Sequence, residues 1–136
     1  MQYVYVDIRK NWLDARDYCR TLSEGDLVSI HSTEEEAAVR AVGSPYGQTY
    51  WIGINDLARD GVPNWSDGTL FNEEVTKWGT MHPQSGECGV FDVDNNFWWD
   101  LPCTARKQPF ICQVGVFVVA PTSLDCMGAC VCCLDW

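Results

Sequence analysis

A chain of 136 residues that is 46% apolar, with seven Trp, five Tyr and five Phe, fits one folded domain and excludes a disordered chain. Nineteen acidic residues against nine basic ones give a formal net charge of −10, which disfavours nucleic acid and anionic membrane surfaces as partners. The longest apolar run, Val114–Ala120, is too short to span a bilayer.

The chain opens with a predicted strand, a helix and a short buried run. Tyr3–Val6 alternates like an edge strand. Asn11 can cap a helix whose buried stripe recurs at spacings of three and four residues. That stripe consists of Trp12, Ala15, Cys19 and Leu22. The apolar run Leu27–Ile30 follows as a short buried segment.

A capping box predicts the start of a second helix. Ser32 can cover a free amide of the first turn, and Glu35 can reach back to the cap. The helix continues through Ala38 and Val42 and is expected to stop at Gly43, where a left-handed conformation costs little.

Beyond residue 47 the pattern changes to strands separated by a long polar segment. Tyr50–Ile54 reads as a buried strand, and residues 55–89 are rich in Asp, Asn, Gly and Pro with little periodicity. Loops of that length are usually functional. Two further strands are expected at Cys88–Val93 and Phe110–Val114. A solvated turn between strands is expected from Asp92, Asp94, Asn95 and Asn96.

Eight widely spaced cysteines indicate disulfides and an oxidising compartment. The sequon Asn64-Trp65-Ser66 is consistent with secretion. Four of the cysteines lie close together at the end of the chain. They are Cys126, Cys130, Cys132 and Cys133. Three alternatives are open for them: two local disulfides, an intermolecular bridge that links an oligomer, or a metal cluster. The oxidising context disfavours the metal cluster.

Seven motifs follow one another in the order and spacing of a known family. They are WLDARDYC at 12–19, LVSIHSTEEE at 27–36, YWIGIND at 50–56, NWSDG at 64–68, GECGVF at 86–91, FWWDLPC at 97–103 and PFIC at 109–112. With them the chain resembles the C-type lectin-like domain. The resemblance implies an α+β fold, in which two helices flank two small antiparallel sheets below a long loop region. It places the domain at 1–114 and leaves 115–136 as a Cys-rich tail.

The resemblance also assigns four cysteines. It implies that Cys19 in the first helix pairs with Cys112 in the last strand, and that Cys88 pairs with Cys103 across the loop region. The first bridge would close a loop of more than ninety residues, a closure worth roughly 4–5 kcal/mol in the chain-entropy model.

Sugar-binding relatives hold calcium with a Glu-Pro-Asn or Gln-Pro-Asp tripeptide, a following acid, and Asn-Asp after a tryptophan. Here the tripeptide position reads His82-Pro83-Gln84, the following acid is Glu87, and the Asn-Asp position reads Trp99-Asp100. Calcium requires six to eight oxygens, and a neutral imidazole is a poor substitute for one. We therefore expect no standard sugar-coordinating calcium.

Two metal sites remain as expectations. Asp56 and Asp60 match the family's auxiliary calcium ligands, which allows weak calcium there. His82 with Glu87 and Asp100 would suit zinc, which accepts four mixed nitrogen and oxygen ligands. The alternative, which we favour, is that His82 is an ordinary exposed loop histidine.

Paired tryptophans suggest a ligand contact. Trp98 matches the family's core tryptophan and is expected to be buried, so Trp99 should point to the other side of an extended segment. Trp99 then either stacks on a ligand or packs locally. His31 is expected to be structural. No motif places a nucleophile beside a histidine, so we do not expect an enzyme.

The sequence thus predicts a secreted recognition module that binds glycans, among them sugars of microbial surfaces. The predicted binding residues are His82, Gln84, Glu87, Trp99 and Asp100, with altered or absent calcium. The alternative is a lectin fold that has lost sugar binding and recognises a cell-surface protein or another ligand such as ice.

Overall fold

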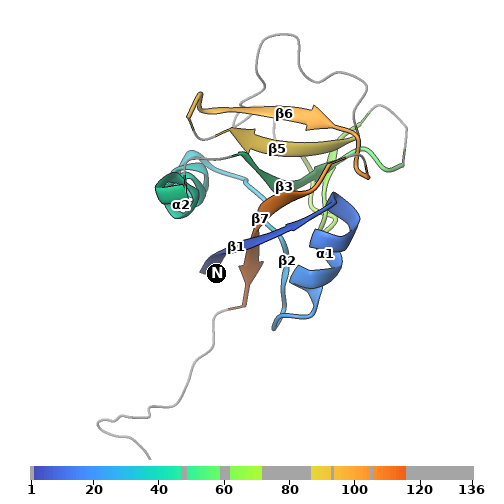
Figure 1. Cartoon of the computed structure of the whole chain (residues 1–136), viewed down its shortest axis with the longest axis horizontal. Helices are drawn as coiled ribbons and strands as arrows, with labels where there is room; N and C mark the ends of the chain where they lie inside the picture. The colour runs from blue at the N-terminus through green and yellow to red at the C-terminus, as the bar shows by residue number, and fades with distance from the viewer. Residues whose placement is uncertain are drawn as a thin grey trace, which may run out of the picture.

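The structure is a computed structural model that describes residues 2–46, 49–58, 62–71, 87–92, 94–104 and 106–115 (Figure 1). The expectations for Asp60, His82, Gln84 and the tail cysteines lie outside these residues. In chain order the elements are β1 (Gln2–Lys10), α1 (Trp12–Arg20), β2 (Asp26–Leu27), α2 (Thr33–Gly43), the 3₁₀ helix η1 (Ser44–Tyr46), β3 (Thr49–Asn55), β4 (Asn64–Trp65), β5 (Cys88–Asp92), β6 (Phe97–Leu101) and β7 (Gln108–Val114). Neither helix is long and apolar enough to cross a membrane in the part of the chain described.

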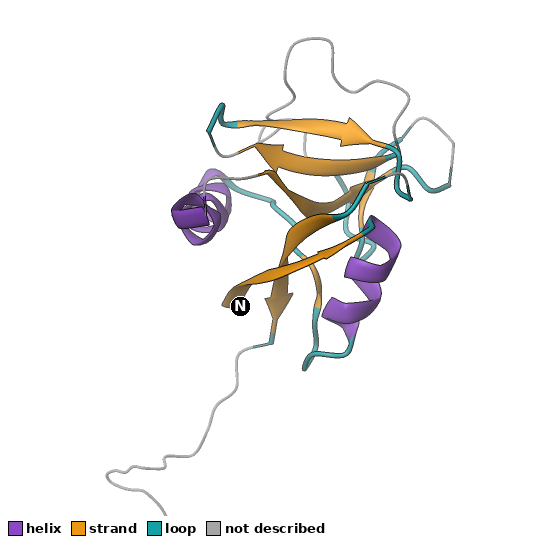
Figure 2. Ribbon diagram, viewed as in Figure 1, coloured by secondary structure: helices purple, strands orange, loops and turns teal. Residues whose placement is uncertain are grey.

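The strands form one mixed sheet in the order β1-β7-β3-β5-β6, with β2 beside β7 and β4 beside β3. Every pair is antiparallel except β3 and β7, which run parallel where Trp51 lies opposite Phe110. The expected α+β fold is confirmed, and the two expected antiparallel sheets are the two halves that this parallel contact joins. Figure 2 shows α1 and α2 on opposite sides of the strands.

The expected start of α1 is confirmed at Asn11. Its side chain accepts a hydrogen bond from the backbone N–H of Asp14 at 2.8 Å, which satisfies one free amide of the first turn. The helix buries Trp12, Ala15 and Cys19, as their spacing predicts, but it ends at Arg20, so Leu22 lies beyond the helix and packs against the core from the following turn. The helix is therefore specified by its cap and by one apolar stripe.

The capping box of α2 is also present, with one difference. Ser32 accepts from the backbone N–H of Glu35 at 3.0 Å. The carboxylate of Glu35 accepts from the N–H of His31 at 2.7 Å, one residue before the cap residue that the sequence predicts. Two free amides at the start of the helix are satisfied in either case.

Gly43 ends α2 for a different reason than expected. It is the last helical residue, and the cap that follows, Ser44, is right-handed with φ −57°. A Cβ at Gly43 would overlap the ring of Tyr50. Close packing of the helix on β3, and not a left-handed turn, requires glycine here.

Two hydrophobic cores lie on the two faces of the sheet. The first core lies under α1 and consists of Val6, Trp12, Ala15, Cys19, Leu27, Trp51, Cys88, Val90, Cys103, Phe110 and Cys112. The second core lies toward α2 and consists of Val28, Ile30, Val39, Tyr50, Ile52, Ile54, Trp65, Phe91, Trp98 and Ile111. Neighbouring residues of β3, β5 and β7 alternate between the two cores, so these strands are buried on both faces.

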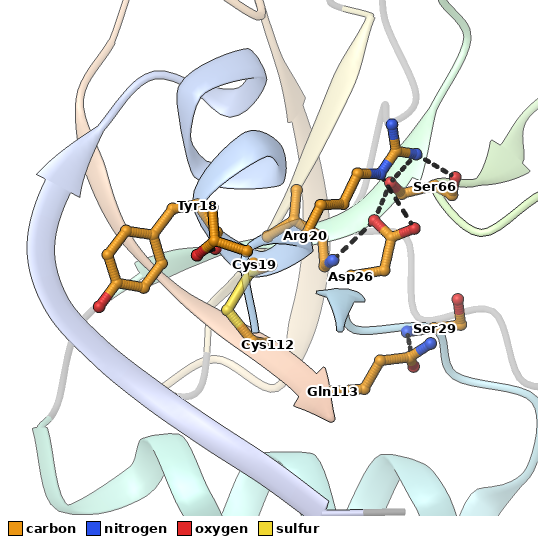
Figure 3. Close-up of a disulfide and its surroundings, with 10 residues drawn as sticks. Tyr18, Cys19, Arg20, Asp26, Ser29, Ser66, Cys112 and Gln113 are labelled. Atoms are coloured by element: carbon orange, nitrogen blue, oxygen red, sulfur yellow. Dashed lines mark hydrogen bonds and ion pairs between the residues drawn. A yellow bond between two sulfur atoms is a disulfide. The ribbon is translucent and has the colours of Figure 1, made fainter. Parts of the chain in front are cut away.

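Both expected disulfides are present. Cys19–Cys112 joins α1 to β7 across 93 residues of sequence (Figure 3). Cys88–Cys103 joins the start of β5 to the segment after β6, 15 residues apart. All four cysteines belong to the first core, which the two bridges therefore hold together.

Candidate functional site

The strand register brings three acidic residues to one end of the sheet. Asn55 at the end of β3 lies opposite Cys88, and Cys88 lies opposite Leu101 of β6. Asp56 follows β3 and Glu87 precedes β5 at this same end, and the N–H of Asp56 donates to the carbonyl of Glu87 at 2.8 Å. We call this region the loop end of the sheet, because the segments 56–63 and 72–87 begin or finish there.

Asp100 lies one residue inside the loop end, opposite Gly89. It is only 7% exposed, whereas Asp56 and Glu87 are half-buried. A buried carboxylate must be satisfied by hydrogen bonds or by a cation. Asp100 is therefore better suited to hold the chain or a cation beneath the loop end than to contact a sugar directly.

The paired tryptophans project to opposite faces of β6, as their adjacency predicts. Trp98 is fully buried in the second core and packs edge-on against Trp65, with ring centroids 5.6 Å apart. Trp99 is half-buried, packs against the first core and lies edge-on to Phe97 at 5.6 Å. Trp99 and Asp100 therefore do not share a face, and the geometry favours local packing for Trp99 over a contact shared with the acids.

The described residues do not complete a metal site by themselves. Across the described part of the chain, no three His, Cys, Asp or Glu side chains converge as a group that could hold a metal ion. His82, Gln84 and Asp60, which the sequence adds to Asp56, Glu87 and Asp100, lie outside that part. The described acids alone do not fit the six to eight oxygens of calcium.

Asp67, which in the sequence stands out only as part of the motif NWSDG, is the centre of a hydrogen-bond network. Its carboxylate accepts from the N–H and hydroxyl of Thr69 at 3.0 and 2.6 Å and from Nε2 of Gln113 at 3.1 Å. Burial raises the pKa of Asp67, but hydrogen bonds from Thr69 and Gln113 outweigh burial and hold that pKa below its ordinary value. The network ties the turn after β4 to β7.

A second anchor holds the same turn to α1 and β2 (Figure 3). Nε of Arg20 donates to Asp26 at 3.3 Å, and Nη2 of Arg20 donates to the carbonyl of Ser66 at 2.9 Å. The hydroxyl of Ser66 donates to the nearly buried carboxylate of Asp26. The turn is thus fixed from both sides before the chain enters the long segment 72–86.

His31 contributes to this anchoring, in agreement with the structural role expected for it. Its Nε2 lies 2.8 Å from the hydroxyl of Thr69, and its ring lies edge-on to Trp65 with centroids 5.9 Å apart. A signal for the network was present in the polar residues of NWSDG, but their partners at Asp26 and Gln113 are 40 and 46 residues away in sequence.

The turn between β5 and β6 is confirmed, but one of its acids is not solvated. Asp92 is buried, and its carboxylate accepts from the N–H groups of Asp94 and Asn95 and from the side chain of Asn95, at 2.9–3.1 Å. Asn96 supplies the left-handed residue of the turn, with φ 60°. Asp92 therefore shapes the hairpin and is not a ligand-binding residue.

Comparison with known proteins agrees with this architecture. The family model of the lectin C-type domain matches residues 8–114. Lithostathine-1-alpha of Homo sapiens is 31% identical over 119 residues, which cover 82% of this chain and 70% of the relative. The beta subunit of the snaclec botrocetin from Bothrops jararaca is 33% identical over 106 residues, 76% of this chain and 81% of the relative.

Solved structures match the fold as well. Human lithostathine superimposes with a TM-score of 0.75 at 30% identity, covering 82% of this chain and 81% of that one. The herring type II antifreeze protein superimposes with a TM-score of 0.71 at 27% identity, covering 81% and 87%. The two helices, the mixed sheet, the two disulfides and the match over residues 8–114 lead to one conclusion: the chain belongs to the C-type lectin domain family.

Proposed function

We propose that this protein is a secreted recognition domain that binds glycans through the loop end of the sheet, without the standard calcium of sugar-binding relatives. The observation that carries the proposal is the meeting of Asp56, Glu87 and Asp100 at one end of the sheet. Residues so far apart in sequence meet only because the register of β3, β5 and β6 brings them there. Buried disulfides support an oxidising, extracellular location.

The chemistry of the loop end suits a polyhydroxylated ligand. Half-buried carboxylates at Asp56 and Glu87 can accept hydrogen bonds from neighbouring sugar hydroxyls, and such charge-assisted bonds are about twice as strong as neutral ones. In the proposal Gln84 adds an amide, and His82 adds a donor or a metal ligand. The net charge of −10 argues against anionic partners such as nucleic acids.

The residues that replace the standard calcium ligands argue for a changed or absent metal. A tryptophan at 99 contributes no oxygen, and its ring packs against the first core. His82 would shift any cation preference from calcium toward zinc, because imidazole nitrogen is a softer donor than carboxylate oxygen. We propose that Asp56 and Glu87 hold the sugar directly, or that Glu87 and Asp100 hold it through zinc, and that calcium takes no part.

A glycan array tests the proposal. The oxidised protein is applied in EDTA, in calcium and in zinc, beside the variants Glu87→Gln and Asp100→Asn. The exposed turn residue Asp94 supplies the matched control, Asp94→Asn, because it removes the same charge at the opposite end of β5 and β6. We expect a glycan signal that survives EDTA or requires zinc, falls in the first two variants and persists in the control. An array with no signal in any metal condition contradicts glycan binding.

A second candidate is recognition of a protein or another non-sugar ligand. Packing of Trp99 against the core, at the position of a calcium ligand, favours it, because it removes part of the sugar-coordinating set. A snaclec subunit and an antifreeze protein are among the similar chains and show how varied the family is. Ice recrystallisation assays, and cross-linking to cell-surface proteins through a photoreactive group at Glu87, would distinguish these ligands from a glycan. The tail cysteines, in this view, link chains into an oligomer.

A further inference from the structure

We infer that Asn64 carries an N-linked glycan that covers an exposed apolar side chain, Leu70. Asn64-Trp65-Ser66 is the only Asn-x-Ser/Thr sequon in the chain. The inference rests on passage through the secretory pathway, which is part of the proposed function, but it does not depend on which ligand the loop end binds.

The strand pairing of β4 directs Asn64 outward. Trp65 lies opposite Ile54 of β3, and both side chains are fully buried in the second core. Successive side chains of a strand point to opposite faces, so Asn64 points away from that core. Asn64 is half-buried, its backbone carbonyl accepts from Asn55, and no hydrogen bond within the described chain engages its side-chain amide. The nitrogen that would carry the sugar is therefore unused by the fold.

The neighbour of Asn64 explains what a sugar at this position would do. Leu70 forms an isolated antiparallel bridge with Asn64. Residues paired in this way project to the same side, with Cβ atoms about 4.5–5.5 Å apart. Leu70 is 81% exposed, the highest value among the large apolar residues described, and Val62 nearby in sequence is 57% exposed. The first sugar residue on Asn64 would lie beside Leu70 and shield it from water and from other proteins.

The order of events follows from the same geometry. In the folded protein Trp65 is buried and the Ser66 hydroxyl is bonded to Asp26, so the sequon is not available as an extended peptide. The transfer must therefore precede folding. The side-chain nitrogen of Asn64 attacks C1 of a lipid-linked oligosaccharide pyrophosphate. A C–N bond forms, the C1–O bond to the pyrophosphate breaks, the amide nitrogen loses one proton, and the lipid pyrophosphate leaves. Because Asn64 points outward, the chain can then fold with the sugar attached.

Expression in a eukaryotic secretory pathway tests the inference. The protein is fused to a signal peptide and to a flexible tail with one Asn-Ala-Thr acceptor. Glycosylation of this acceptor shows that the molecule was exposed to the oligosaccharyltransferase. Intact mass is measured on translocated chains only, before and after peptide N-glycosidase treatment in heavy-oxygen water, which labels each former glycan site. We expect labelled Asp at position 64, loss of that label in Asn64→Gln, and retention in Asn95→Gln, a matched change in the exposed turn outside any sequon.

A translocated, disulfide-bonded protein whose tail acceptor is occupied while Asn64 is bare would overturn the site. Shielding has its own readout, the binding of a hydrophobic dye to the folded protein. We expect dye binding to rise in Asn64→Gln and to return to the glycosylated level in Asn64→Gln with Leu70→Ser. Equal dye binding in the glycosylated protein and Asn64→Gln would overturn the shielding role. Asn64→Gln is also applied to the glycan array. We expect it to bind as the wild-type protein does, so that a failure at Asn64 is distinguished from a failure of the loop end to bind glycans.

Discussion

The two disulfides allow a prediction whose magnitude follows from the structure. Replacing Cys88 and Cys103 together by Ala opens a 15-residue loop, and replacing Cys19 and Cys112 opens a 93-residue loop. The chain-entropy model assigns about 3 kcal/mol to a 15-residue closure and about 4.7 kcal/mol to one of roughly 100 residues. The long bridge should therefore stabilise the fold by about 1.6 kcal/mol more than the short one.

The comparison is well matched, because all four cysteines are buried in the same core. The lost packing of two sulfur atoms is similar in the two double variants and largely cancels in the difference. Each loss is a large fraction of the 5–15 kcal/mol that usually separates folded from unfolded protein. The long-bridge variant is accordingly expected to unfold at markedly lower urea concentration.

Urea unfolding followed by tryptophan fluorescence and by circular dichroism measures both losses, with the wild-type chain as reference. Hydrogen exchange shows which part of the fold each loss of stability affects. Removing the short bridge should increase exchange at the loop end and leave β1 and β7 protected. A short-bridge variant that is the less stable of the two, or whose exchange rises equally in β1 and β7, would rule out this assignment of the two bridges.

Three further predictions concern charge and metal. Calorimetry should find no tight calcium binding and at most weak binding through Asp56 and Asp60; micromolar calcium affinity that disappears in Asp100→Ala would contradict this. If the loop end binds a cation, zinc should be preferred over calcium, and zinc should then raise the melting temperature at neutral pH. This stabilisation should disappear as the pH falls through roughly 6.5, because only neutral imidazole binds zinc, and it should be absent in His82→Ala. Asp67, whose pKa the fold lowers, contributes stability that is present above its unfolded pKa of about 3.9 and is lost as pH falls through the lower folded value. Asp67→Asn should therefore flatten the acid unfolding curve in that window, and an acid transition identical to wild type would show that the network around Asp67 contributes nothing.

Local signals predicted the helices and several strands well. Asn11 and Ser32 cap their helices as expected, because a cap depends on residues only three positions apart. Two short strands were missed. β6 has bulky side chains on both faces, and β4 has only two residues, so neither shows a usable periodicity. Gly43 was identified as a helix end, but its packing against Tyr50 depends on tertiary contacts that no local pattern contains.

The candidate site was less predictable than the fold. Individual acids such as Glu87 and Asp100 could be named from the resemblance, but their burial could not. Asp100 is buried because β6 faces the second core at Trp98 and Asp100 alike. Trp99 packs on the first core because successive side chains of β6 point to opposite faces of the sheet. The anchors at Asp67 and Asp26 depend on partners distant in sequence, so only the folded chain reveals them.

Binding through the loop end is tested most directly by a nuclear magnetic resonance titration of the oxidised protein with the strongest ligand from the glycan array. We expect shift changes at the backbone amides of Asp56, Glu87 and their neighbours at the loop end. The indole N–H of Trp99 should change little, because its ring packs on the opposite face of β6 from Asp100. Saturable shifts confined to β1 and α2, or a large change at Trp99 with none at Asp56 and Glu87, would contradict binding through the loop end.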